Sequence, residues 1–154
     1  MSAPVNMVQL VKELHSRPRG RACIVLTLED EGQKEWATEL ARQTESKHID
    51  LLELFAEDQD LGNQIGQFLV PRLFEFLENR SQAPVLIVSG MEFLTATWTG
   101  QPKNIEEFAS HVKTWNQTPC LLFVLQYDKT LATYDFGRRY QYTFVVDQKE
   151  TLAL

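Results

Sequence analysis

The segment that decides the fold runs from Ile24 to Gln43 and reads IVLTLEDEGQKEWATELARQ. It begins as a continuous apolar run, passes through a short acidic turn with one glycine, and continues with the period of an amphipathic helix. This succession of strand, loop and helix is typical of a nucleotide-binding loop. The loop nevertheless carries Glu29, Asp30 and Glu31 where phosphate groups would lie. The segment therefore indicates a phosphate site, a degenerate form of one, or an ordinary turn between a strand and a helix.

Short apolar runs elsewhere in the chain predict further strands. They are continuous rather than alternating, which is typical of strands covered on both faces of a mostly parallel sheet. The runs are Ala22–Leu28, Pro84–Ser89, Pro119–Gln126 and Tyr142–Asp147, with a weaker candidate at His48–Leu54. Segments with helical periodicity lie between them. The predicted fold is α/β, a three-layer sandwich around a five-stranded, mainly parallel sheet.

The helical segments show recognisable boundary residues. Pro71 should kink or divide the helix predicted over Leu61–Leu77, because proline lacks a backbone N–H. Asn104, followed by Glu107, resembles a capping box at the start of the helix predicted over Ile105–Trp115. An N-terminal helix around Met7–Leu14 should end at the segment RPRG. We expect a single domain over 1–154, with helix and linker in 1–20 and a core in 21–150.

The composition excludes several classes of protein. The chain has 154 residues and a formal net charge of −6, so direct binding to nucleic acid, which needs a basic surface, is not expected of the chain alone. No apolar run is long enough to cross a bilayer, and the first ten residues do not resemble a signal peptide. Both cysteines, Cys23 and Cys120, lie in apolar runs and should be buried, reduced thiols. We expect a cytoplasmic protein without contact with a membrane.

The phosphate-loop pattern G-x-x-x-x-G-K-[ST] fits the chain in one register. Gly32 takes the second glycine, while the first glycine, the lysine and the hydroxyl residue are replaced by Thr27, Gln33 and Lys34. A neutral amide in place of the lysine loses a charge-assisted contact of about 1.5–3 kcal/mol. Lys34 cannot ligate magnesium. Two loop carboxylates about 5 Å apart repel each other by roughly 3 kcal/mol at an effective dielectric constant of 20.

The third predicted strand is altered in the same way. A Walker B strand ends in an aspartate that orders the metal ion, often with a catalytic glutamate soon after. Here the strand ends in Ser89, and Glu92 follows three residues later. Glu92 remains a weak catalytic candidate, because a carboxylate alone lacks a positioned phosphate and metal. We therefore expect no metal site and no ATP or magnesium cofactor.

Two degenerate motifs in the correct order support a resemblance to a known family. The segments SGMEFL and YDFGRRYQYTFVVD, together with the chain length and element order, resemble the BrxF family, small P-loop (AAA-like) proteins of type 3 BREX phage-defence systems. The resemblance covers roughly residues 20–150. It implies the strand order 5-1-4-3-2, which places Cys23 and Cys120 on neighbouring strands. It also implies ATP hydrolysis, with which both altered Walker positions disagree.

Arg138 and Arg139 lie between aromatic residues before the last predicted strand, and adjacent arginines can bind phosphate groups or a partner.

Three functions are compatible with these sequence observations. The chain is a non-hydrolysing adaptor that docks on an active ATPase, a weak ATPase that uses Lys34 and Glu92, or an acidic inhibitor that mimics nucleic acid. The adaptor hypothesis predicts a protein partner, such as a larger P-loop ATPase for which Arg138 and Arg139 act as arginine fingers, and allows a homo-oligomer.

Overall fold

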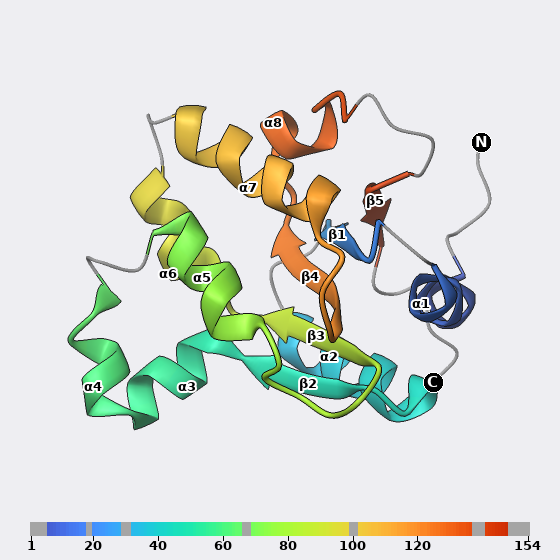
Figure 1. Ribbon diagram of the computed structural model, residues 1–154, viewed down its shortest axis with the longest axis horizontal. Coiled ribbons are helices and arrows are strands. Elements are labelled where there is room, and N and C mark those ends of the chain that lie inside the picture. The colour runs from blue at the N-terminus through green and yellow to red at the C-terminus, as the bar shows by residue number, and fades with distance from the viewer. Residues whose placement is uncertain are drawn as a thin grey trace.

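The fold is seen in a computed structural model that describes residues 6–17, 20–28, 32–65, 69–98, 102–136 and 141–147. A five-stranded sheet lies at its centre, and helices cover both faces (Figure 1). The chain therefore has the predicted α/β architecture with three layers.

The described elements alternate between helices and strands along most of the chain. In chain order they are α1 Met7–Ser16, β1 Ala22–Thr27, α2 Gln33–Thr44, β2 Lys47–Asp50, α3 Leu51–Glu57, α4 Gln59–Gly62, α5 Val70–Leu77, β3 Val85–Ser89, α6 Glu92–Thr95, the 3-10 helix η2 Ala96–Trp98, α7 Pro102–Thr114, β4 Cys120–Gln126, α8 Lys129–Ala132 and β5 Thr143–Val146.

The sheet has the order β2-β3-β4-β1-β5, and every neighbouring pair is parallel. Read from the opposite edge, this sheet is 5-1-4-3-2, the same sequence of neighbours that the resemblance implied. The prediction of a mainly parallel sheet is strengthened, since the described pairings include no antiparallel pair. The carboxyl ends of all five strands meet at one edge, where ligands bind in open α/β sheets.

Continuous apolar strands supply a core on each face of the sheet. All six residues of β1 are buried, and alternate residues belong to different clusters. Ile24 and Leu26 contact the cluster that includes α5 and α7, while Cys23 and Val25 contact the cluster that includes α1 and α2. This two-sided burial explains why the run is continuous, because neither face of the strand meets water.

The two cysteines lie where the sequence predicted. Cys23 is in β1 and Cys120 is in the neighbouring strand β4, and both are buried and free. Burial raises the pKa of the Cys23 thiol to about 12. It also raises the pKa of Cys120. Both thiols are therefore protonated packing groups rather than nucleophiles.

The weak strand candidate His48–Leu54 is corrected by the structure. Strand β2 ends at Asp50, and helix α3 begins at Leu51. The reason is a cap, because the Asp50 carboxylate accepts a hydrogen bond from the backbone N–H of Glu53 at 3.0 Å. Only the first half of the apolar run is therefore extended.

Two helix boundaries were predicted from proline and asparagine. The helix expected over Leu61–Leu77 is divided as predicted, and Pro71 lies in the first turn of α5, where its missing N–H costs nothing. The predicted cap at Asn104 is wrong. Helix α7 begins at Pro102, so Asn104 lies inside the first turn. Proline is favoured at such a start for the same reason.

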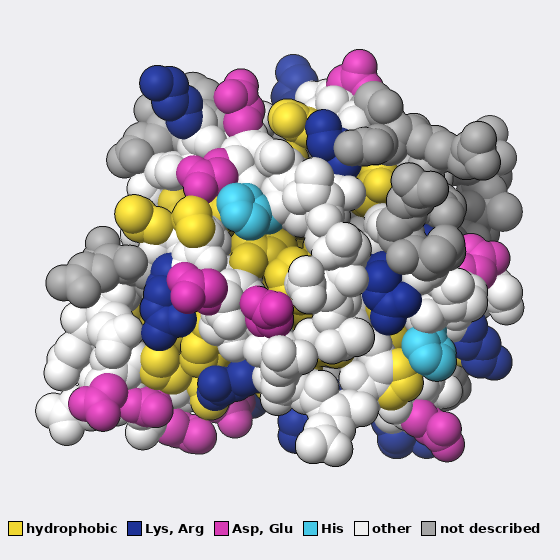
Figure 2. Space-filling view, viewed as in Figure 1, with side chains coloured by type: hydrophobic (Ala, Val, Ile, Leu, Met, Phe, Trp, Pro, Cys, Tyr) yellow, Lys and Arg dark blue, Asp and Glu magenta, His cyan; other side chains and the backbone are white. Residues whose placement is uncertain are grey.

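The surface carries a concentration of acidic side chains. Figure 2 shows Asp and Glu gathered at the lower left, over α3 and α4, where Glu53, Glu57, Asp58 and Asp60 are exposed.

Among the described residues, no helix combines the length and the apolar character that a membrane span requires.

The aromatic core between the sheet and α7 should dominate stability. Phe108 is fully buried, and its ring lies 5.0 Å from Phe123 and 5.4 Å from Trp98 between centroids. Phe108→Ala should lower the free energy of unfolding by about 3–5 kcal/mol. Leu52→Ala, at a side chain 57% exposed, is the control and should change it by less than about 0.5 kcal/mol. Equal effects in urea titrations would show that this core is not as described.

Candidate functional site

The predicted site residues gather at the carboxyl edge of the sheet. Thr27 ends β1, Gly32 is the N-cap of α2, and Gln33 and Lys34 are the first two residues of that helix. Ser89 ends β3. Strand β1 and helix α2 thus follow each other in the order that the sequence pattern predicted.

Two groups of predicted residues belong to segments that the structure does not describe. Glu29, Asp30 and Glu31, at which we expected carboxylates to face the phosphate position, lie outside the described residues. Arg138 and Arg139 also lie outside them. Glu92 is described, and it is the half-buried first residue of α6.

Gln33 and Thr27 contact each other inside the protein. The Gln33 amide nitrogen donates to Thr27 Oγ1 at 3.2 Å, and Thr27 Oγ1 donates to the Leu125 carbonyl, also at 3.2 Å. Gln33 is 8% exposed and Thr27 is fully buried. The side chain that the sequence pattern aligned with the lysine of a phosphate loop is thus a neutral amide held against the end of the sheet.

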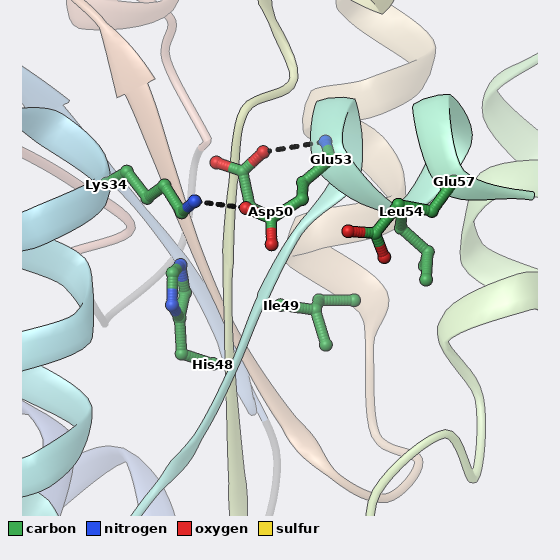
Figure 3. A pocket seen from close by; sticks show the side chains of 7 residues that line it. All are labelled: Lys34, His48, Ile49, Asp50, Glu53, Leu54 and Glu57. Atoms are coloured by element: carbon green, nitrogen blue, oxygen red, sulfur yellow. Dashed lines mark hydrogen bonds and ion pairs between the residues drawn. The ribbon is translucent and has the colours of Figure 1, made fainter.

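Lys34 turns to a different partner. Its ammonium group forms an ion pair with Glu53 of α3, and both side chains are about half exposed. The hydrogen bond with Glu53 is the main reason why the pKa of Lys34 is raised. Figure 3 shows the Lys34 side chain extended from α2 towards α3, above His48 and beside Asp50. In this arrangement Lys34 neutralises a carboxylate of its own chain.

Ser89 is fully buried between two polar side chains that sequence reasoning did not identify. Its hydroxyl donates to Asp50 Oδ2 at 2.9 Å, and its oxygen lies 2.7 Å from His48 Nε2. His48 and Asp50 are two residues apart on β2 and so point to one side of the strand. In the sheet register Asp50 pairs with Ser89. The Ser89 hydroxyl, which the sequence pattern aligned with a Walker B aspartate, therefore hydrogen-bonds within the protein.

A cavity of about 210 Å³ opens at the carboxyl end of β2 (Figure 3). It is lined by Lys34, His48, Ile49, Asp50, Glu53, Leu54 and Glu57. The lining contains three carboxylates and one lysine, so its net charge is −2 when His48 is neutral. Lys34 also borders a second hollow of about 230 Å³ along the outer face of α2. The edge of β2 is therefore an accessible, acidic part of the candidate site.

The signal for His48 and Asp50 was present in the sequence but ambiguous. Their alternation within HID is what a strand requires, yet neither residue belongs to any phosphate-loop motif. Burial lowers the pKa of His48 and outweighs the attraction of Asp50, which raises it.

Within the described part of the chain, no group of three or more His, Cys, Asp or Glu residues could hold a metal ion.

Comparisons with protein-family models, with curated proteins and with solved structures found no match to this chain.

Gly90 should be essential for the geometry around Asp50. Its φ is +69°, and a Cβ there would lie 2.5 Å from Asp50 Oδ1. Gly32 has a φ of +78° but nothing within 4 Å of an added Cβ, so it is a matched control. Gly32→Ala should cost about 1–2 kcal/mol through backbone strain. Gly90→Ala should cost about 1–3 kcal/mol more, since displacing the Asp50 carboxylate breaks its bond to Ser89.

Urea unfolding of the two variants measures this difference. Equal losses of stability would contradict the close approach of Gly90 and Asp50.

Proposed function

We propose that this chain is a non-hydrolysing, P-loop-like adaptor that docks on an active P-loop ATPase in a multisubunit complex. The observation that carries the proposal is the buried hydrogen bond from Gln33 to Thr27. A lysine at this point of a phosphate loop reaches the β- and γ-phosphates. Here a neutral amide takes its place and is already bonded to the sheet.

The order of the strands supports the P-loop-like part of the proposal. The neighbours β5-β1-β4-β3-β2 and the helix that follows β1 match the arrangement implied by the resemblance to the BrxF family. Gly32, with positive φ at the N-cap of α2, supports it as well. Many functions share one fold, so the activity must be argued from the site.

The site argues against nucleotide hydrolysis at three positions. Gln33 carries no charge for phosphate, Lys34 is paired with Glu53, and Ser89 is bonded to Asp50. Each of these side chains would have to break its present interaction before it could contact a nucleotide. The sequence adds the acidic residues Glu29, Asp30 and Glu31 between β1 and α2, and their charge opposes phosphate.

The acidic row over α3 and α4 gives some support to a mimic of nucleic acid. Duplex DNA carries one charge per about 1.7 Å. The two helices span residues 51–62, which is at most about 18 Å at about 1.5 Å per residue, so a faithful mimic would need roughly ten charges. The exposed carboxylates described there are Glu53, Glu57, Asp58 and Asp60. The row is too sparse for this function, and docking on a protein remains our proposal.

The resemblance extends the proposal to the setting of the protein. An adaptor in a complex of the BREX phage-defence type would act in the cytoplasm and would bind a larger ATPase or further copies of itself. In ATPases of this class one subunit often completes the site of the next with an arginine. Arg138 and Arg139 are our candidates for that contact, because guanidinium groups stay charged and bind phosphate oxygens in pairs.

ATP with magnesium should not stabilise this protein. A ligand present at 100 times its Kd adds about 2.7 kcal/mol of stability, which is about 5–10 °C in Tm for a chain of this size. We expect no such rise at millimolar ATP in a thermal melt, with an active P-loop ATPase as the positive control. A rise of several degrees that Lys34→Ala abolishes would overturn the proposal in favour of a weak ATPase.

The contact with the partner can be tested by a pull-down of the tagged chain from its native host, followed by identification of any ATPase. The double variant Arg138→Ala with Arg139→Ala should retain its circular dichroism spectrum and lose binding to that ATPase or stimulation of its turnover. The exposed pair Arg72 and Arg80, both changed to alanine, is the control for loss of positive charge. Wild-type binding and turnover with the Arg138 and Arg139 variant would rule out this contact.

A further inference from the structure

His48 is placed between two hydroxyl groups that both have a second partner. Its Nδ1 lies 3.2 Å from Thr38 Oγ1 of α2, and its Nε2 lies 2.7 Å from Ser89 Oγ of β3. Thr38 Oγ1 also lies 2.8 Å from the Lys34 carbonyl, and Ser89 Oγ lies 2.9 Å from Asp50 Oδ2. These four contacts form a continuous chain of polar groups from α2 across β2 to β3.

Counting protons shows which form of the imidazole satisfies this chain. A carbonyl and an ionised carboxylate only accept, so Thr38 must give its hydroxyl proton to Lys34, and Ser89 must give its own to Asp50. Each hydroxyl has one proton, and both are then used. The two remaining contacts need protons from Nδ1 and from Nε2. All four hydrogen bonds therefore coexist only when His48 is the doubly protonated imidazolium.

A neutral ring must give up one of these bonds. If the proton is on Nε2, Ser89 still donates to Asp50, and the Thr38 hydroxyl turns from the Lys34 carbonyl to Nδ1. If the proton is on Nδ1, Ser89 donates to Nε2 and the Asp50 carboxylate loses a buried donor. The second loss is larger, because it removes a hydrogen bond from a charged acceptor rather than from a neutral carbonyl. The neutral form should thus carry its proton on Nε2.

Charged groups on α2, β2 and α3 act on His48, while β3 contacts it through the uncharged Ser89. Asp50 at the end of β2 and Glu53 of α3 favour the imidazolium, while Lys34 of α2 and Lys47 of β2 oppose it. Burial opposes it most strongly and lowers the pKa below its ordinary value. The hydrogen bonds accepted by Thr38 and Ser89 act in the other direction, because a bond donated by the charged ring is stronger than one made by the neutral ring.

We propose that His48 is a proton-binding site whose charged form is held by Thr38 and Ser89, so that pH sets the charge of the cavity beside it. Above the transition the lining of the 210 Å³ cavity carries −2, and below it the lining carries −1. A positively charged group is therefore attracted to this cavity more strongly at neutral pH than in acid. The inference requires neither a bound nucleotide nor a protein partner and is independent of the proposed function.

The test is an NMR titration of the three histidines, His15, His48 and His111, with His48→Gln used to assign the signal. Thr38→Val keeps the shape of the side chain and removes the acceptor for Nδ1–H. Ser89→Ala removes the acceptor for Nε2–H. Either variant should lower the pKa of His48 by about half a unit to one unit. The signals of His15 and His111 should not move.

Thr114→Val is the matched control, because Thr114 makes the same bond to a carbonyl four residues earlier, at 2.9 Å, on α7. It should leave the pKa of His48 unchanged. The nitrogen chemical shifts of the neutral ring should show the proton on Nε2. Should Ser89→Ala fail to fold, Thr38→Val at an exposed helix position decides the question. A Thr38→Val shift no larger than that of Thr114→Val, or a neutral ring protonated on Nδ1, would overturn the proposal.

Discussion

Strand β1 is hydrogen-bonded to β4 on one side and to β5 on the other, and both of its faces are buried under helices. This double constraint organises the rest of the structure. A central strand without an exposed face has to be apolar throughout, and its polar backbone has to be satisfied by both neighbours. The bonds from Ile24 to the Tyr142 carbonyl and from Leu28 to the Val146 carbonyl do so at the β5 side. Because β1 ends at Thr27, the loop and the helix that follow are delivered to the edge of the sheet where a ligand would bind.

At that edge the polar groups satisfy one another. Gln33 bonds to Thr27, Lys34 pairs with Glu53, and Ser89 joins Asp50 to His48. In an active phosphate loop the corresponding groups remain available for phosphate and metal. The buried pairs matter most, since an unsatisfied buried donor or acceptor costs about 1–3 kcal/mol. The exposed ion pair of Lys34 and Glu53 contributes little to stability and mainly fixes the direction of these two side chains.

Sequence reasoning succeeded where the cause was local. Continuous apolar runs identified β1, β3, β4 and β5, and Pro71 indicated the start of a separate helix because of its missing N–H. It failed where two local signals competed. Asn104 offered a cap, but the chain enters α7 two residues earlier, at Pro102. In the run after His48 the apolar character continued, while the Asp50 carboxylate capped α3 and ended the strand. A cap outweighs apolar continuity at that point because it satisfies a helix N–H that would otherwise lack a partner.

The sequence by itself determined the class of fold, the succession of β1 and α2, and the burial of both cysteines. Each of these follows from the residue types within one segment, whose period and charge can be read without its neighbours. Only the tertiary structure decided that His48 meets Ser89, 41 residues further along the chain, and that Thr38 and Asp50 complete the group. The physical reason is the register of β2 against β3. Parallel strands are joined through long crossovers, so the residue types near His48 do not indicate which side chain will lie opposite the end of its strand.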